Sequence, residues 1–91
     1  MKIYLAVNDW STEDASGVST YAFDTLEKAK EEVRKWIEEE KRECWEQAFD
    51  ENGELVDGYE LEQTALSWEI WESGYYVSSH TSIEIRILEV L

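Results

Sequence analysis

Residues 24–48 contain neither glycine nor proline, the two residues that most often interrupt a helix. Projected on a helix, the apolar side chains of this segment fall within a stripe about 120° wide, as in an amphipathic helix that packs on one side. The stripe consists of Leu26, Ala29, Val33, Trp36, Ile37, Cys44 and Ala48. A helix of this length spans about 36 Å and a seven-residue strand only about 23 Å, so we expect the helix to extend past its sheet. Asp24 and Thr25 are both suitable N-caps, and Asp24 gives the better capping box because Glu27 lies three residues after it.

Segments of alternating hydrophobicity on both sides of this helix predict the strands of a sheet. Residues 2–8 and 18–23 alternate in steps of two, which is typical of strands with one buried face, and their closeness favours an antiparallel pair. Residues 83–87 alternate strictly. Residues 54–73 alternate less regularly and fit either a strand or, over residues 60–71, a short helix.

These elements give the order β-β-α-β-β and a single α+β domain over residues 1–91, in which a small antiparallel sheet carries one long helix packed on one face. We expect residues 83–87 to form a central or near-central strand, with Ile83, Ile85 and Ile87 facing the helix. The apolar residues that follow continue on the opposite parity, which suggests a bulge or a strand covered on both faces.

Acidic residues outnumber basic ones by 22 to 8, which gives a formal net charge of −14. The imbalance is concentrated in residues 43–91, where Arg86 is the only basic residue against twelve acids, whereas residues 28–42 carry a net charge of +1. DNA, RNA and anionic lipid are excluded as direct ligands, because binding them requires clustered lysine and arginine. Carboxylates at this density repel one another and destabilise the compact state, so we expect a compensating reason, either solubility or the binding of a basic partner.

The sequence offers little for catalysis or metal binding. Cys44 and His80 are its single cysteine and single histidine. One chain therefore has too few ligands for a structural zinc site, and Cys44 on the apolar stripe is expected to be unreactive. The four glycines are isolated turn residues and form no phosphate-binding loop. We expect no enzyme activity, no cofactor, and no catalytic or metal-binding residues. No apolar run approaches the roughly 18–20 residues of a membrane span, so we expect a cytoplasmic protein.

Aromatic residues that leave the core indicate a binding function instead. Trp10 lies in the polar segment 8–17, which is expected to be a loop or a wide hairpin connection. Trp68 and Trp71 are three residues apart, so on a strand they point to opposite faces and one of them leaves the core. Exposed tryptophan and tyrosine are typical of interface anchors. The alternative is that these side chains only cover the second face of a small sheet.

Acidic residues could surround such anchors. Glu60 and Glu62 are alternate residues that would form a row on one face of a strand, and Glu69 could join the row from a neighbouring strand. The acids near the end of the helix would extend this area. The candidate partner-binding residues are Trp10, Glu43, Glu46, Glu54, Glu60, Glu62, Glu69, Trp71 and Tyr76.

The first half of the chain resembles many small uncharacterised proteins of bacteria and their phages. The resemblance is carried by the opening strand KIYL at residues 2–5 and by FDTLEKA at residues 23–29, where a strand passes into a capped helix. The size and acidity also resemble those of phage anti-defence inhibitors, including anti-CRISPR proteins. The resemblance implies an origin in a mobile element more than a mechanism, and some of these inhibitors mimic nucleic acid. Our first hypothesis is therefore an acidic protein-binding module, either an inhibitor that mimics nucleic acid and occupies a basic surface of a nucleic-acid-binding protein such as a CRISPR nuclease, or another acidic adaptor for a basic protein surface.

A second hypothesis is a homo-oligomeric structural or accessory protein without enzymatic activity. A helix that extends past the sheet could form a homodimer through residues 28–48, using Trp36, Ile37, Cys44 and Trp45. The nearly neutral block within this segment would tolerate self-association better than the acidic second half.

Overall fold

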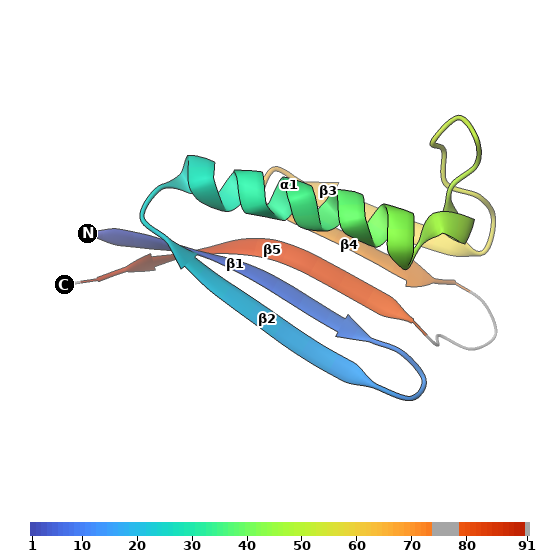
Figure 1. The fold of residues 1–91 in the computed structure, drawn as a ribbon, viewed down its shortest axis with the longest axis horizontal. Helices are drawn as coiled ribbons and strands as arrows, with labels where there is room; N and C mark the ends of the chain where they lie inside the picture. The colour runs from blue at the N-terminus through green and yellow to red at the C-terminus, as the bar shows by residue number, and fades with distance from the viewer. Residues whose placement is uncertain (74–78, 91) are drawn as a thin grey trace.

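A computed structural model describes residues 1–73 and 79–90 of the 91-residue chain. The fold is α+β, with one five-stranded antiparallel sheet and a long helix packed against one of its faces, as Figure 1 shows. The elements are β1 (Lys2–Ser11), β2 (Ser16–Phe23), α1 (Leu26–Glu43), a short 3-10 helix η1 (Glu46–Ala48), β3 (Tyr59–Thr64), β4 (Ser67–Glu72) and β5 (His80–Glu89). The predicted class is confirmed, and the sheet has one strand more than expected.

The strand order is β2-β1-β5-β4-β3, so β5 occupies the centre of the sheet as predicted. Ile83 and Ile85 are 0% and 7% exposed and belong to the core. Ile87 has the same parity but is 46% exposed, because the paired ends of β1 and β5 extend beyond the start of α1 (Figure 1).

The expected irregularity near the end of β5 is absent from the described strand. Pairing between β1 and β5 is unbroken from Lys2 opposite Glu89 to Ser11 opposite His80, so there is no bulge. Leu88 is 47% exposed, and the strand is therefore not covered on both faces. Leu88 and Val90, the apolar residues that follow Ile87 on the opposite parity, lie at the exposed C-terminal end of β5 and just beyond it.

The helix ends earlier than its sequence pattern suggested. The carbonyl oxygen of Glu40 accepts hydrogen bonds from the backbone N–H groups of both Cys44 and Trp45, at 3.0 and 2.8 Å, and the chain then turns. An 18-residue helix spans about 27 Å, whereas the ten-residue strands β1 and β5 span about 33 Å. The prediction that the helix extends past the sheet was therefore wrong, because the strands are longer and the helix is shorter.

The N-cap of α1 is Thr25 rather than Asp24. The hydroxyl of Thr25 accepts a hydrogen bond from the backbone N–H of Lys28, at 3.2 Å. The Asp24 carboxylate instead accepts from Lys28 Nζ at 2.9 Å, and this contact lowers the pKa of Asp24. The capping box expected from Asp24 and Glu27 is therefore not formed, because Asp24 binds the Lys28 side chain and Thr25 caps the helix.

The core lies between α1 and the sheet. Its fully or nearly buried members are Ala6, Ala29, Val33, Trp45, Ala48, Trp68, Ile70, Ile83 and Ile85. Trp36 and Ile37 are half-buried and pack against this cluster, and the Trp36 ring lies 5.4 Å from that of Tyr21 on β2. The side chains offered for a homodimer through residues 28–48 thus pack on their own sheet, apart from the exposed Cys44.

The segment for which both a strand and a short helix were considered forms a hairpin of two strands. β3 and β4 are joined by Ala65 and Leu66 alone. The Thr64 hydroxyl holds this turn: it lies 2.7 Å from the Ser67 hydroxyl and accepts a hydrogen bond from the backbone N–H of Leu66 at 3.3 Å. The short helix over residues 60–71 is therefore excluded.

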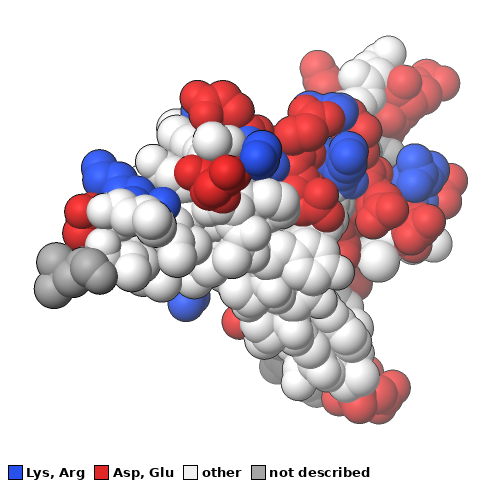
Figure 2. Space-filling view, turned by 60° about the vertical axis from the view of Figure 1, so that its left-hand side comes forward, with Lys and Arg blue, Asp and Glu red and all other residues white. Residues whose placement is uncertain are grey.

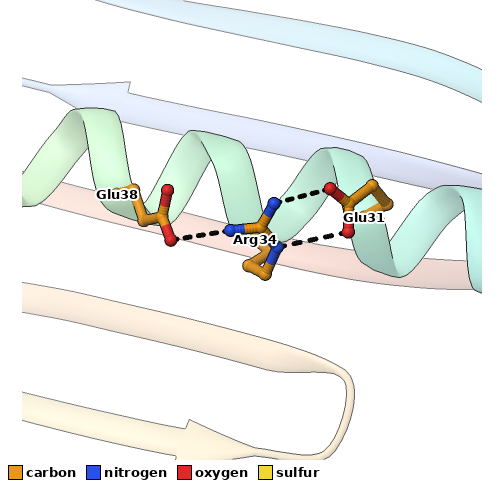
Figure 3. A network of polar contacts seen from close by, with 3 residues as sticks. All are labelled: Glu31, Arg34 and Glu38. Carbon is orange, nitrogen blue, oxygen red and sulfur yellow. Dashed lines mark hydrogen bonds and ion pairs between the residues drawn. The ribbon is translucent and has the colours of Figure 1, made fainter.

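The outer face of α1 carries interspersed acidic and basic side chains (Figure 2). Arg34 contacts Glu31 at 2.6 Å and Glu38 at 2.7 Å, as Figure 3 shows. The hydrogen bond from Arg34 lowers the pKa of Glu31. These exposed pairs contribute little to stability because water screens them.

Candidate protein-binding surface

The face of the sheet opposite α1 collects acidic residues from four strands. Leu61, Trp68 and Ile70 point toward α1, so their neighbours in the strands point away from it. We call the resulting group the acidic face. It consists of Asp9 on β1, Glu60 and Glu62 on β3, Glu69 and Trp71 on β4, and Glu84 on β5.

The strand register brings the acidic side chains close together. Glu62 lies directly opposite Glu69, so their Cβ atoms are about 4.5–5.5 Å apart. Across the next strands, Glu69 lies opposite Ser82, which in turn lies opposite Asp9. Like charges in directly opposed positions destabilise a sheet. Repulsion between the carboxylates of the acidic face therefore lowers the stability of the free protein, since the sheet holds them at fixed positions.

Only part of this charge is compensated within the described residues. Arg86 donates hydrogen bonds to Glu84, with the shortest contact at 2.6 Å. His80 Nε2 lies 3.6 Å from a carboxylate oxygen of Glu69, and this contact becomes an ion pair only when the imidazole is protonated. Glu60 and Glu62 are exposed and have no basic partner among the residues that the structure describes. They are free to meet cationic groups of another molecule.

Trp71 supplies an apolar contact within the acidic face. It lies between Glu60 on β3 and His80 on β5 in the register of the sheet and is half-buried. Trp68, on the opposite side of the same strand, is 1% exposed and belongs to the core, as the spacing of the two tryptophans predicted. A tryptophan rimmed by carboxylates offers a large apolar area and a ring that attracts cations.

Trp10 lies on the other side of the sheet. β1 continues to Ser11, so Trp10 is part of a strand. The expected hairpin connection exists but covers only residues 12–15, so the predicted extent of residues 8–17 was wrong. Its indole covers Gly17 so closely that a Cβ atom at Gly17 would lie 2.7 Å from a ring carbon. Trp10 therefore does not contribute to the acidic face.

A cavity of about 320 Å³ lies beside Trp10, between the end of α1 and the sheet. Across its wall, Trp45 Nε1 donates to the Thr81 hydroxyl at 3.0 Å, and that hydroxyl donates to Glu40 at 3.4 Å. Glu40 lies at helical spacing between Ile37 and Cys44 of the apolar stripe, and this contact explains how its carboxylate is accommodated there. Cys44 also lines the cavity, and partial burial together with Glu40 raises the pKa of its thiol. The thiol is therefore a weak nucleophile.

Comparison of the chain with protein-family models, with curated proteins and with solved structures gave no match. The function must therefore be argued from the geometry of this chain. In residues 1–73 and 79–90, no three metal-binding side chains converge on a common point. No helix in the same residues has the length and apolar character needed to cross a membrane.

The structure brings together four of the predicted binding residues: Glu60, Glu62, Glu69 and Trp71. Glu43 is the last residue of α1 and Glu46 the first residue of η1, and both line a smaller cavity of about 180 Å³ together with Glu72. Glu54 lies in the exposed loop before β3. Tyr76 lies outside the described residues.

Sequence reasoning missed two members of the acidic face. Glu84 alternates with Ile83 and Ile85, so its parity already placed it away from α1. Asp9 was missed because the strand that carries it was predicted to end before it.

Proposed function

We propose that this protein is a non-catalytic binding module for a basic protein surface, and that the acidic face is its contact area. The observation that carries the proposal is the direct opposition of Glu62 and Glu69 next to Glu60, on one side of a rigid sheet. Such an arrangement destabilises the free protein, and a cationic partner relieves the repulsion.

The spacing of the carboxylates suits a surface that normally binds nucleic acid. Glu60 and Glu62 are separated by two residues of a strand, or about 6.6–6.8 Å. This matches the rise along the helix axis of duplex DNA over two successive phosphates of one strand, at about 3.4 Å each. We therefore infer a nucleic-acid mimic that occupies the basic groove of a DNA- or RNA-binding protein. The resemblance to anti-CRISPR inhibitors makes a CRISPR nuclease in a bacterial cytoplasm the first partner to test.

The carboxylates and Trp71 have different roles in this proposal. Dense exposed charge steers a positive groove into contact, so it raises the association rate and makes that rate sensitive to salt. A large aromatic side chain at the centre of a contact mainly slows dissociation. The two contributions are therefore separable by kinetics.

The test is to recover partners from a bacterial lysate with the immobilised protein, and then to measure binding kinetics with each purified partner. The variant Glu60→Lys/Glu62→Lys/Glu69→Lys reverses the charge of three of the five acidic residues of the acidic face. The matched control, Asp14→Lys/Glu39→Lys/Glu51→Lys, changes the net charge equally at exposed positions elsewhere. We expect the first variant to slow association by about tenfold or more and to flatten its salt dependence, and the control to have a much smaller effect.

Two further measurements complete the test. Trp71→Ala should speed dissociation while the association rate stays nearly constant. Duplex DNA or RNA should compete with the protein for the partner, which distinguishes a mimic from a binder of some other basic surface. Equal effects of the two lysine variants would show that the acidic face is only a solubilising coat.

A further inference from the structure

A second surface of this protein, the free edge of β2, has properties opposite to those of the acidic face. The strand order leaves β2 and β3 at the two edges of the sheet. β3 carries Glu60 and Glu62, whereas β2 (Ser16–Phe23) is the one described strand without a charged residue. Six of its eight residues are exposed. In Figure 2 an uncharged area extends from beneath α1 toward the tip of the β1–β2 hairpin.

A free strand edge presents unpaired N–H and C=O groups to any other strand, and monomeric proteins usually block it with charges, proline or a bulge. β3 is blocked by its two glutamates. β2 has none of these features: the chain has no proline, and the pairing of β2 with β1 is unbroken from Tyr4 opposite Phe23 to Ser11 opposite Ser16. The edge is therefore open for pairing.

The side chains of β2 also leave apolar area uncovered on both faces. Tyr21 points toward α1 and contacts the Trp36 ring, but it remains 53% exposed. Val18 points to the opposite face and is 64% exposed. A strand placed alongside β2 would contact both residues as well as the backbone.

We propose that two copies of this chain associate through their β2 edges, antiparallel to each other, to form one continuous ten-stranded sheet. A two-fold axis perpendicular to the sheet, close to Ser19 and Thr20, relates the copies and keeps both α1 helices on the same side. The edge is uncharged, so it offers no electrostatic attraction to a basic or acidic partner. It is self-complementary, because two β2 strands oppose only hydroxyl, small and apolar side chains.

The register can be examined from the parity of the strand. Residues facing α1 in one copy must lie opposite residues facing α1 in the other, so Tyr21 meets Gly17 or Ser19, and Val18 meets Thr20 or Ala22. Both registers pair a larger side chain with a smaller one. Neither places two charged residues opposite each other.

Charges lie only beyond the ends of the paired strands. Glu13 and Asp14 of one copy come near Asp24 and Glu27 of the other, and these like charges repel. Added salt screens this repulsion and should strengthen the association. The acidic face predicts the reverse, since salt weakens its contact with a basic partner. The two proposals are therefore independent and have opposite salt dependence.

Sedimentation equilibrium of the purified protein between 0.05 and 0.5 M salt tests this association. We expect a monomer–dimer equilibrium whose dissociation constant falls as salt rises. Thr20→Lys places a charge at the centre of the edge and should raise the dissociation constant by about tenfold or more. The matched control is Gln63→Lys, an exposed residue of the other edge strand, and it should leave the constant unchanged within about twofold.

A cross-linking experiment covers the case in which Thr20→Lys does not fold. In a Cys44→Ser background, either Ser19→Cys or Thr20→Cys should form an intermolecular disulfide on mild oxidation. Ser19 lies opposite its own copy in the register that pairs Tyr21 with Gly17, and Thr20 does so in the register that pairs Tyr21 with Ser19, so the Cα atoms of one symmetric pair lie within about 4.4–6.8 Å. Gln63→Cys should not. A protein that stays monomeric at 0.5 M salt would overturn the proposal, and so would association that salt weakens. Cross-linking through Gln63→Cys that equals the cross-linking through both β2 variants would overturn it as well.

Discussion

Ile83→Ala removes the ethyl and methyl groups of a side chain that is fully buried in the central strand. The atoms lost beyond Cβ correspond to about three methylene groups, or about 2.4 kcal/mol at about 0.8 kcal/mol each. The unfilled space left between the sheet and α1 adds a cavity contribution, so the expected loss of unfolding free energy is about 3–4 kcal/mol. A domain of this size has a total stability of only about 5–14 kcal/mol, so the variant should be folded but much weakened.

The matched control is Ile87→Ala on the same strand and the same side. Ile87 is 46% exposed, because β5 extends beyond the first turn of α1 at this point (Figure 1). About half of its side chain is already in water and no closed cavity can form, so the expected loss is about 1 kcal/mol. The difference between the two variants therefore isolates the effect of burial from that of strand propensity.

Urea unfolding followed by circular dichroism and tryptophan fluorescence measures both free energies. Trp68 lies directly opposite Ile83 on β4, so its fluorescence reports on the same part of the core. The slope of unfolding free energy against urea concentration should be the same for the unsubstituted protein, Ile83→Ala and Ile87→Ala if their denatured states are alike. Losses that agree within about 0.5 kcal/mol for the two variants would refute the placement of β5 beneath α1.

Two further predictions concern local contacts. Because Arg34 lowers the pKa of Glu31, the Glu31 carboxylate stabilises the fold above its unfolded-state pKa of about 4.3, and this contribution is lost as pH falls through the lower folded-state value. Carboxyl NMR titration should show that Arg34→Gln raises the midpoint of Glu31 but not that of Asp24, which Lys28 holds; equal shifts of the two would contradict the assignment. Gly17→Ala should destabilise the protein by about 1–3 kcal/mol in thermal or urea unfolding, since the added methyl group meets the Trp10 indole at 2.7 Å. An unchanged stability would show that Trp10 moves freely away from β2.

Features that depend on periodicity along the chain could be predicted from the sequence. The amphipathic pattern of residues 24–48 indicated the helix and the face that it buries, and the strict alternation of residues 83–87 indicated the strand beneath it. The spacing of Trp68 and Trp71 indicated that only one of them is in the core. Each conclusion depends on neighbours within a few residues, whose directions are set by the local backbone geometry.

Turns without distinctive residues could not be predicted in this way. The turn between β3 and β4 uses Ala65 and Leu66, which are not typical turn residues, and a threonine hydroxyl holds it in place. One hairpin was therefore expected to be a single strand or a short helix. The end of α1 was missed for a similar reason, because the burial of Trp45 against Thr81 on a distant strand stops the helix.

The side of the sheet on which each residue lies was determined by tertiary packing. Residues 2–8 alternate, but alternation does not state which side α1 covers. α1 packs over the side with the small Ala6, which is fully buried, and Ile3 and Leu5 fall on the other side. A close helix–sheet contact favours small side chains, and only the assembled layers show where that contact is made.

The acidic face was likewise determined partly by the sequence and partly by the tertiary structure. Sequence alternation determined that Glu60 and Glu62 share a side of their strand. Only the strand order places Glu69 and Asp9 in line with them and leaves Trp10 on the opposite side, because neighbouring strands are far apart in the sequence. Local periodicity thus determines the direction of a side chain, while non-local strand pairing determines which side chains meet.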